Sequence, residues 1–288
     1  MVADSSFEEK VKELAQWFET HDSLPELIDD VVLRRFLYSM ENDVEEAKKL
    51  ILHSYSMRTK HSNLFFDRDP IDDKIQKIFE VADLGVPMPN LTACKRRIVI
   101  NRLIDHDPDK FDFDMIVKAF FLSADMRFSI RDDDLPLKIN CGDIPIFDMT
   151  GLSYRHLTKL SLSTLRCYMR FTQEGFPVRL KEIHLINVSP VLSKLLTIIK
   201  PFMKTRVKNM LNYHEPNSST FFEFIDQDLM PIEYGGKAGK MSDIKLDFTK
   251  QLESRREYLT CPKRWKPRDN NNKIISNVRS TFTDLSID

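Results

Sequence analysis

Glycine is scarce in this chain, with 7 residues in 288. A loop that wraps a phosphate in backbone amides needs several closely spaced glycines, because other side chains would keep the backbone away from the anion. The nearest approach is GGKAGK at Gly235–Lys240, but its spacing differs from GxxxxGK[ST] and Met241 replaces the hydroxyl residue. We therefore expect no nucleotide-binding loop.

Cysteine is rarer still. The four cysteines are widely separated and form no CxxC pair: Cys94, Cys141, Cys167 and Cys261. They predict free, buried thiols rather than a disulfide framework or a zinc site. The seven histidines are scattered, and His184 alternates with Ile183 and Leu185, which favours a hydrogen-bonded structural histidine. We expect neither a metal nor a cofactor.

Long apolar runs and catalytic signatures are also missing. No run approaches the roughly 20 residues of a membrane-spanning helix, and the N-terminal MVADSSFEEK is acidic, so we expect no membrane anchor and no signal peptide. The segment GLSYR at Gly151–Arg155 has only the first glycine of a nucleophile elbow. The composition is that of a soluble globular protein, which we expect to be cytoplasmic and not an enzyme.

Acidic residues are absent from one long stretch, residues 183–214. This stretch carries five spaced bases: Lys194, Lys200, Lys204, Arg206 and Lys208. At about 100° per residue, its lysines share one arc of a helix and its apolar residues fill the opposite arc, with a kink expected at Pro201. Two hypotheses remain open. The apolar arc covers the protein core, as in most amphipathic helices, or it meets a surface that is both apolar and anionic, such as a phospholipid membrane.

The net charge of −1 conceals two opposed regions. Residues 1–80 contain 18 acids and 11 bases, whereas residues 149–214 contain 11 bases and 2 acids. Because the overall field is weak, we expect no nucleic-acid partner.

Hydrophobic periodicity predicts helices followed by alternating strands and helices. The predicted helices are Phe7–Glu19, Val31–Tyr38, Val44–Met57, Ile71–Phe79, Met115–Ile130, Tyr154–Phe171 and Met241–Tyr258. The predicted strands are Arg96–Leu103, Ile144–Met149, Lys181–Asn187 and Thr220–Ile225. This alternation predicts an α/β fold with a mostly parallel sheet. The breaker Gly85–Pro89 predicts a domain boundary.

With these residues in place, the chain resembles the CRAL-TRIO family of lipid-binding proteins. It is most similar to the branch of α-tocopherol transfer protein and cellular retinaldehyde-binding protein, and to insect members of that branch. The resemblance spans about Leu24 to Tyr258 and depends on several motifs in order. These are IFDMTGLS (Ile146–Ser153), IHLIN (Ile183–Asn187), KPF (Lys200–Phe202) and EYGG (Glu233–Gly236), with weaker support from LRRFLYSMENDVEEA (Leu33–Ala47).

The resemblance implies a small all-helical N-terminal domain (1–85), a CRAL-TRIO lipid-binding domain (86–260) and a polar basic tail (261–288). The lipid-binding domain would hold an apolar cavity with a sheet floor, closed by a mobile lid helix at about Ser189–Asn209. The ligand-binding residues would be Phe121, Phe128, Phe147, Leu152, Tyr168, Phe171, Phe176, Val178, Leu180, Ile183, Leu192, Leu195, Ile199 and Met203. For each of them, plain core packing is the alternative.

Polar contacts are implied with less detail. Candidates for the polar end of the ligand are Tyr168, Asp125 and Ser129. Basic residues of the tocopherol branch bind phosphoinositides, and the matching or neighbouring positions here are Arg179, Lys181, Lys200, Lys204 and Arg206. This chain departs from that pattern at Tyr38, Met40 and Met210, and Arg34 and Arg35 are the bases nearest in sequence that would compensate.

The predicted function is a monomeric carrier that moves a hydrophobic ligand, such as tocopherol, a retinoid, a carotenoid or a similar lipid, between membranes. Its lid would open at an anionic membrane, with which the protein associates peripherally. The alternative is a phosphoinositide-sensing adaptor that recruits a partner protein. A lipid hydrolase is a third hypothesis, disfavoured by the missing nucleophile elbow.

Overall fold

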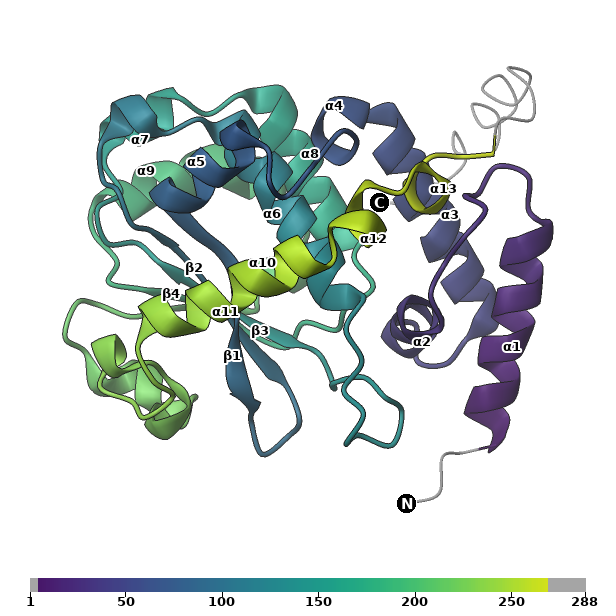
Figure 1. Ribbon diagram of the computed structural model, residues 1–288. Helices are drawn as coiled ribbons and strands as arrows, with labels where there is room; N and C mark the ends of the chain where they lie inside the picture. The colour runs from purple at the N-terminus through teal and green to yellow at the C-terminus, as the bar shows by residue number, and fades with distance from the viewer. Residues whose placement is uncertain (1–4, 269–288) are drawn as a thin grey trace.

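In the computed structural model, which describes residues 5–268, a helical region packs beside an α/β region (Figure 1). The helices of the first region are α1 (Ser5–Thr20), α2 (Asp30–Ser39), α3 (Val44–Lys60) and α4 (Ser62–Phe65). The first three of these helices enclose fully buried apolar side chains, among them Leu14, Phe18, Leu37 and Ile51, whereas Phe65 of α4 belongs to the core of the α/β region. Spacings of three and four residues place Leu14 and Phe18 on one face of α1, so the predicted helical periodicity is confirmed.

The α/β region is built on one five-stranded sheet with the order β1-β2-β3-β4-β5. The strands are β1 (Ala82–Leu91), β2 (Arg97–Leu103), β3 (Asp143–Asp148), β4 (Ile183–Ile186) and β5 (Leu211–Tyr213). β1 is antiparallel to β2, and the other pairs are parallel. The predicted α/β fold with a mostly parallel sheet is therefore confirmed.

Helices cover both faces of this sheet. They are α5 (Asp73–Val81), α6 (Phe113–Phe128), α7 (Tyr154–Thr158), α8 (Leu162–Glu174), α9 (Val191–Ile199), α10 (Thr205–Lys208), α11 (Met241–Ser254), α12 (Arg256–Thr260) and α13 (Pro262–Trp265). Right-handed crossovers that each advance one strand in the same direction place α6, α8 and α9 on one face. The helix α11 crosses the other face in front of β1 (Figure 1).

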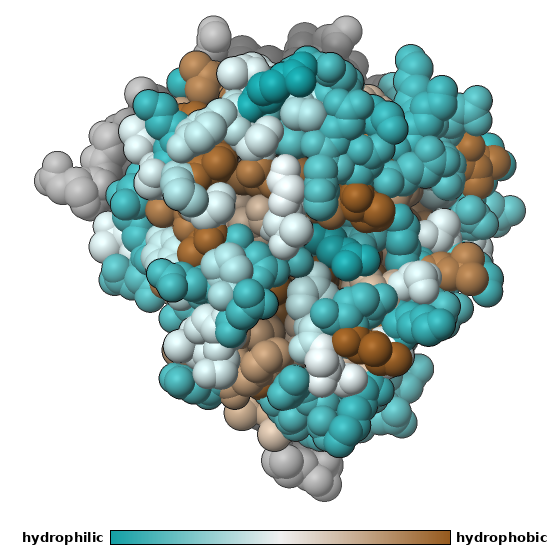
Figure 2. Space-filling view, turned by 90° about the vertical axis from the view of Figure 1, so that its left-hand side faces the viewer, coloured by the Kyte–Doolittle hydropathy of each residue, from teal (hydrophilic) through white to brown (hydrophobic). Residues whose placement is uncertain are grey.

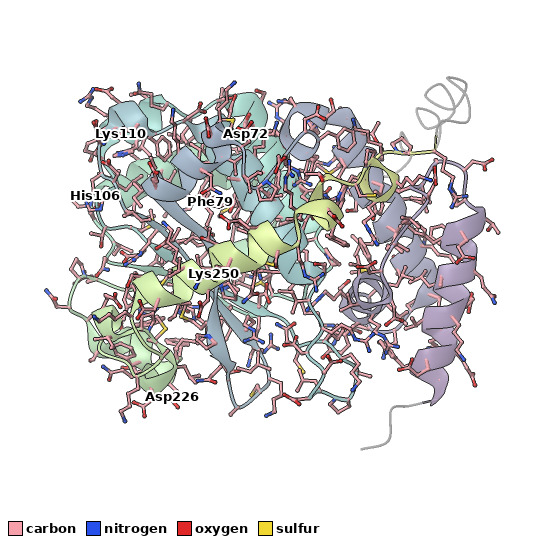
Figure 3. All side chains as sticks on the ribbon, viewed as in Figure 1. Asp72, Phe79, His106, Lys110, Asp226 and Lys250 are labelled. Carbon is pink, nitrogen blue, oxygen red and sulfur yellow. The ribbon has the colours of Figure 1, made fainter. Side chains whose placement is uncertain are left out.

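Short 3₁₀ turns complete the chain: η1 (Pro108–Lys110), η2 (Lys200–Phe202), η3 (Ser219–Glu223), η4 (Gln227–Leu229) and η5 (Ile232–Tyr234). Figure 3 shows Phe79, at the end of α5, close to α11, which carries Lys250. Lys245 of α11 donates a hydrogen bond to the Phe79 carbonyl, so α11 is fastened to the element that precedes the sheet. No helix within residues 5–268 has both the length and the apolar character of a membrane span.

The predicted breaker Gly85–Pro89 lies inside β1, so these residues form a strand rather than a break in regular structure, and the domain boundary near them stays a prediction. Gly85 has a φ of +68°, and the pairing of β1 with β2 shifts register on both sides of Val86 and Pro87. β1 is an edge strand, where proline lacks only a hydrogen bond that no neighbouring strand would accept. A bulged edge strand tolerates the residues that sequence patterns assign to a loop.

The predicted strand Thr220–Ile225 is also wrong, because these residues form the turn η3. Phe221 and Ile225 are both buried, and their spacing of four matches a helical turn rather than a strand. The last strand is instead β5, whose three residues are too few to give a periodic signal.

Two predicted helices are interrupted. The first is divided into α7 and α8, because Ser161 caps a new helix by accepting a hydrogen bond from the Thr164 amide. The second is divided at Arg255 into α11 and α12. The beginning of the predicted tail packs on the domain, since Trp265 of α13 is buried edge-on against Tyr258 at 5.6 Å between ring centroids. The remainder of that tail, residues 269–288, lies outside the described residues.

Candidate functional site

The predicted lid is a short helix joined to a 3₁₀ turn. α9 ends at Ile199, η2 contains Pro201, and the backbone becomes extended at Met203 before α10 begins. The predicted kink at Pro201 is thus present. Within α9 only Val191 and Leu192 are buried, although the helix is almost entirely apolar.

The lid covers β4 on the face of the sheet that also carries α6 and α8. Ile183 and Leu185 of β4 cluster with Leu192 of α9, and the half-buried Phe147 and Leu195 pack against this cluster. Alternation along the strand turns His184 to the opposite face. The space between α9 and the strands β3 and β4 is therefore lined by apolar side chains.

The predicted ligand-binding residues divide into two groups by burial. The fully buried ones are Phe121, Phe128, Phe171, Ile183 and Leu192. The half-buried ones are Phe147, Leu152, Tyr168, Phe176, Val178, Leu180, Leu195, Ile199 and Met203. Half-buried apolar side chains beneath a lid retain surface that a ligand can cover, whereas fully buried ones do not.

The buried aromatic residues form a compact cluster. Phe121 stacks on Phe65 with ring centroids 4.4 Å apart, and Phe171 meets both rings edge-on at 4.5 and 5.1 Å. The guanidinium of Arg58 lies 5.1 Å from the Phe65 ring and 5.0 Å from the Phe171 ring. These distances are typical of aromatic pairs and cation–π contacts, so this part of the predicted site packs as core.

Asp125 belongs to a buried ion-pair triad rather than to a ligand. Its carboxylate accepts hydrogen bonds from Arg58 at 2.5 and 2.7 Å and from Arg68 at 2.7 Å, and all three side chains are at least 94% buried. Burial alone would raise the pKa of Asp125, but the two guanidinium groups outweigh it and hold the pKa below its usual value. The suggested contact between Asp125 and a ligand is therefore withdrawn.

The Ser129 hydroxyl is also engaged in hydrogen bonds within the protein. Its hydroxyl donates to the Met126 carbonyl at 2.7 Å and lies 3.2 Å from Nη1 of Arg255. Tyr168 differs, because its hydroxyl makes no hydrogen bond within residues 5–268. Burial strongly raises the pKa of Tyr168, yet its side chain remains partly accessible. A deep, accessible phenol without a partner is suited to bind the polar end of a ligand.

The predicted membrane-binding bases are in different states. The Arg179 guanidinium stacks on the Tyr38 ring at 4.0 Å, so one departure from the family pattern supplies a cation–π platform. Lys204 pairs with Glu174 at 2.9 Å. The other three make no ion pair in the described part of the chain and are exposed: Lys181, Lys200 and Arg206.

Arg34 and Arg35 do not compensate for the missing bases. Arg34 pairs with Glu8 and Asp30, each at 2.6 Å, within the helical region. Arg35 is buried and donates to the carbonyls of Phe128 and Ile130, both at 3.0 Å. Both arginines are structural, and Arg35 fastens α2 to the end of α6.

Three motifs that carry the resemblance are joined by hydrogen bonds to one carboxylate, that of Asp148. Asp148 ends β3 and accepts hydrogen bonds from the Asn187 amide and the Tyr234 hydroxyl, both at 2.9 Å. Thr150 donates to the same carboxylate through its amide at 3.0 Å and its hydroxyl at 2.7 Å. IFDMTGLS, IHLIN and EYGG are thereby joined at the carboxyl ends of β3 and β4. Their separation in sequence gives no sign of this contact.

His184 forms a buried pair, as its strand position indicates. Its Nδ1 lies 3.0 Å from Nε2 of His214, whose own Nδ1 lies 2.9 Å from the Thr220 hydroxyl. The rings of Phe221 and Phe224 pack edge-on against His184 at 5.4 and 5.3 Å. Burial, followed by the proximity of His214, lowers the pKa of His184 to about 4.

This pair predicts a loss of stability in mild acid. The unfolded chain binds a proton near pH 6.5, whereas folded His184 resists it down to about pH 4, so stability falls as the pH drops through this window. With allowance for solvent screening, we expect a loss of about 1–2 kcal/mol between pH 7 and pH 5. Urea unfolding at both pH values should show a smaller difference for His184→Asn. Equal differences in the variant and the wild type would exclude His184 as the source.

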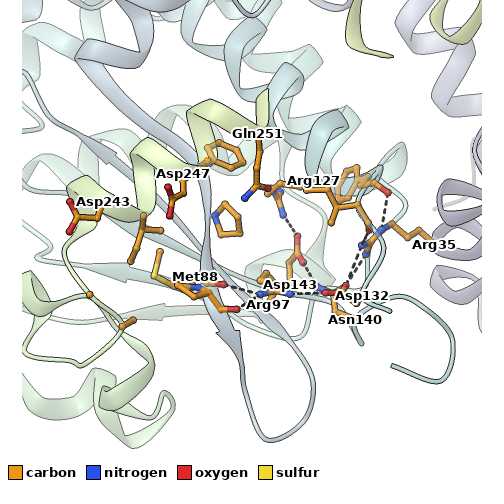
Figure 4. A pocket seen from close by; sticks show the side chains of 18 residues that line it. Arg35, Met88, Arg97, Arg127, Asp132, Asn140, Asp143, Asp243, Asp247 and Gln251 are labelled. Atoms are coloured by element: carbon orange, nitrogen blue, oxygen red, sulfur yellow. Dashed lines mark hydrogen bonds and ion pairs between the residues drawn. The ribbon is translucent and has the colours of Figure 1, made fainter. Parts of the chain in front are cut away.

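A cavity of about 430 Å³ lies on the other side of the sheet, among β1, α11 and the end of α6 (Figure 4). Two ion pairs and one hydrogen bond join polar groups of its lining: Arg97 Nη2 with Asp132 Oδ1 (2.7 Å), Arg127 Nη1 with Asp143 Oδ2 (2.7 Å) and Arg35 Nη1 with Asn140 Oδ1 (2.8 Å). Only Phe128 of the predicted ligand-binding residues lines it. The lining mixes apolar side chains with these charged and amide groups, and it lies away from the lid, so this cavity is not assigned as the lipid site.

Comparison with known proteins agrees with this geometry. A profile of the CRAL/TRIO domain matches residues 85–236, and one of the Pinta-like UBA domain matches residues 3–75. The crystal structure of Sfh5 superposes with a TM-score of 0.50 over 87% of this chain and 98% of that chain, at 12% identity, which shows a shared fold.

Sequence relatives include Clavesin-1 of Xenopus laevis, 28% identical, and human Clavesin-2, 26% identical, each over 208 residues. These matches cover 72% of this chain but only 61% and 62% of the relatives. They do not single out the tocopherol and retinaldehyde branch, which stays a prediction. Because the CRAL/TRIO profile spans more than half of its residues, this chain belongs to the CRAL-TRIO family of lipid-binding and lipid-transfer proteins.

Proposed function

We propose that this protein is a carrier that binds a hydrophobic molecule between its lid and its sheet and transfers it between membranes. The observation that carries this proposal is the set of half-buried apolar side chains packed around Leu192 of α9, among them Phe147, Leu180 and Leu195, together with the Tyr168 hydroxyl, which makes no hydrogen bond within residues 5–268. We further propose that it acts as a cytoplasmic monomer without catalytic activity, in line with a family of carriers.

Burial of apolar area supplies the driving force in this proposal. A long apolar ligand that removes a few hundred Å² from water gains several kcal/mol at about 25 cal/mol per Å². Phe147, Phe176 and Leu195 each retain part of their surface for such a contact. Tyr168 then selects the polar end of the ligand. The tocopherol, retinoid, carotenoid and phospholipid classes all satisfy this chemistry.

Approach to a membrane is proposed to begin with attraction between exposed basic side chains and lipid phosphates. Lys181, Lys200 and Arg206 are exposed and unpaired within residues 5–268, so they remain available to lipid phosphates. Apolar side chains on the face that carries α7 and the turns η3–η5 are scattered among polar ones (Figure 2). On this face, a continuous apolar surface for the bilayer would therefore require the lid to open. Phosphoinositides are the proposed anionic lipids.

The first experiment is native mass spectrometry of the purified protein, followed by organic extraction and identification of any bound molecule. A stoichiometric apolar molecule would support the carrier. A protein that purifies empty, and that takes up none of the offered tocopherol, retinoid or phospholipid, would contradict it.

The charge component predicts a slower transfer in a double variant. Lys181→Glu with Lys200→Glu should reduce the transfer rate to anionic vesicles at least about thirtyfold, because each base contributes about 1 kcal/mol at an anionic surface and its reversal adds repulsion. Ligand affinity should stay near that of the wild type. Fluorescence transfer between labelled vesicles measures the rate.

The matched control is Lys12→Glu with Lys240→Glu, which changes the net charge equally. Both lysines are exposed, one on α1 and one before α11, away from the lid. Equal slowing in both double variants would show that net charge, not this surface, controls transfer. Lys204 is excluded from the design because it already pairs with Glu174.

An adaptor function is the second candidate, favoured by the acidic helical region. Residues 1–80 carry a surplus of seven acids, which suits a basic partner protein. In this case a pull-down should recover the same partner only when lipid is bound. Recovery that is independent of lipid would contradict the adaptor.

A further inference from the structure

The last two residues of α8 contact the base of the lid. Gln173 donates from Nε2 to the Phe202 carbonyl at 2.9 Å, and its Oε1 accepts a hydrogen bond from the Lys204 amide at 2.8 Å. One side chain therefore holds the backbone on both sides of Met203, where η2 ends and the chain becomes extended.

Glu174 holds the same joint through charge. Its carboxylate lies 2.9 Å from Lys204 Nζ, 2.9 Å from Arg170 Nε and 3.4 Å from His53 Nε2. The contact with His53, followed by those with Lys204 and Arg170, holds the pKa of Glu174 well below its usual range. Because His53 lies on α3, this carboxylate connects the helical region, α8 and the lid.

The middle of the lid is less buried than its beginning and packs on the sheet through the half-buried Leu195 and Leu196. Val191 and Leu192 bury its beginning, whereas Lys194 and Thr197 are exposed and Ile199 is half-buried. The lid is thus attached by an apolar anchor at one end and by Gln173 and Glu174 at the other. Release of the polar end would leave α9 able to swing about its buried beginning.

We propose that Gln173 and Glu174 form a latch that keeps the lid closed, and that the phosphates of an anionic membrane open it by taking Lys204 from Glu174. This inference depends on the proposed carrier function, because it names the signal that opens the same site. A partly exposed ion pair and a lysine–phosphate contact at a membrane surface are of similar strength, so the exchange is reversible. The lid then opens where an acceptor membrane is present and closes again in water.

Hydrogen–deuterium exchange of the full chain tests the latch without any cargo. Without vesicles, Glu174→Gln should speed exchange of the amides in residues 191–204 at least threefold, while α11 stays unchanged. The matched control is Glu257→Gln, an exposed carboxylate on α12 that makes no ion pair within the described residues. It should leave the lid as in the wild type. Equal lid exchange in Glu174→Gln and the wild type would overturn the proposal.

A second variant removes the ion pair between Lys204 and Glu174 by changing the lysine. Lys204→Met leaves α8 and its contact with His53 in place, and it should speed lid exchange to a similar extent. Thermal unfolding identifies any variant that has lost its fold rather than its latch. Slow lid exchange in a folded Lys204→Met protein would argue against the ion pair as the latch.

The source of the phosphate is tested with the wild type. Phosphatidylserine vesicles should speed lid exchange, whereas phosphatidylcholine vesicles and inorganic phosphate at equal phosphate concentration should not. Opening by inorganic phosphate alone would overturn the assignment to a membrane. If the latch behaves as stated but no apolar molecule binds, the carrier function fails and the latch stands, so the two outcomes are separable.

Discussion

Replacement of Asp125 by asparagine is expected to lower the free energy of unfolding by about 3–5 kcal/mol. The change removes the carboxylate that Arg58 and Arg68 share, and it leaves two buried guanidinium groups with no carboxylate partner among residues 5–268. A buried charge without a partner costs several kcal/mol, because the interior cannot replace water around it. Urea unfolding followed by circular dichroism measures the difference.

The control for this prediction is an exposed ion pair. Asp228→Asn removes the partner of Lys237, 2.8 Å away on the surface, and should leave the free energy of unfolding close to that of the wild type. A loss below about 1 kcal/mol for Asp125→Asn as well would mean that water reaches the triad. The triad joins α3, α6 and the segment after α4, so its loss should also loosen the aromatic cluster around Phe171.

Replacement of Gly236 by alanine is expected to cost about 3 kcal/mol or more. A Cβ atom at this position would lie 2.0 Å from the Met230 carbonyl oxygen and 2.4 Å from that of Gln227. Both are backbone atoms, so the turn itself must shift to admit the methyl group. The Gly236 amide donates to the Pro231 carbonyl at 3.1 Å, and this hydrogen bond would be displaced with it.

Gly239→Ala separates this clash from backbone strain. Gly239 has a φ of +99°, but no atom lies within 4 Å of the added Cβ, so only the strain of about 1–2 kcal/mol applies. Thermal unfolding of both variants should rank Gly236→Ala as clearly the less stable. Equal melting temperatures would show that the EYGG turn can relax. The final glycine of that motif is therefore explained by close packing rather than by ligand contact.

Most of the regular elements follow from local pattern. The predicted strands Arg96–Leu103, Ile144–Met149 and Lys181–Asn187 match β2, β3 and β4 within a few residues, because buried apolar runs bounded by turns have few other solutions. β1 was missed because its glycine and prolines are tolerated only at a sheet edge, and an edge position is a property of the assembled sheet.

The candidate site was predictable in composition but not in geometry. Helical spacing identifies the apolar positions of α6, α8 and α9. Whether Phe171 turns into the core while Tyr168 remains accessible depends on the packing of α8 beside Phe65 of α4, more than a hundred residues earlier in the chain. Half-burial is decided by such neighbours and has no local signature.

The charged residues show the same difference between what the sequence predicts and what the structure decides. The sequence by itself determined an α/β fold of the CRAL-TRIO type and a basic, acid-free segment at the lid, because these depend on periodicity and on motifs in order. Only the tertiary structure decided which charges are free. Asp125 and Arg58 are 67 residues apart in the chain, yet their side chains lie 2.5 Å apart in space. At the lid, Lys204 forms an ion pair with Glu174 and is therefore not free. Electrostatic interactions depend on distance in space, which local sequence does not encode.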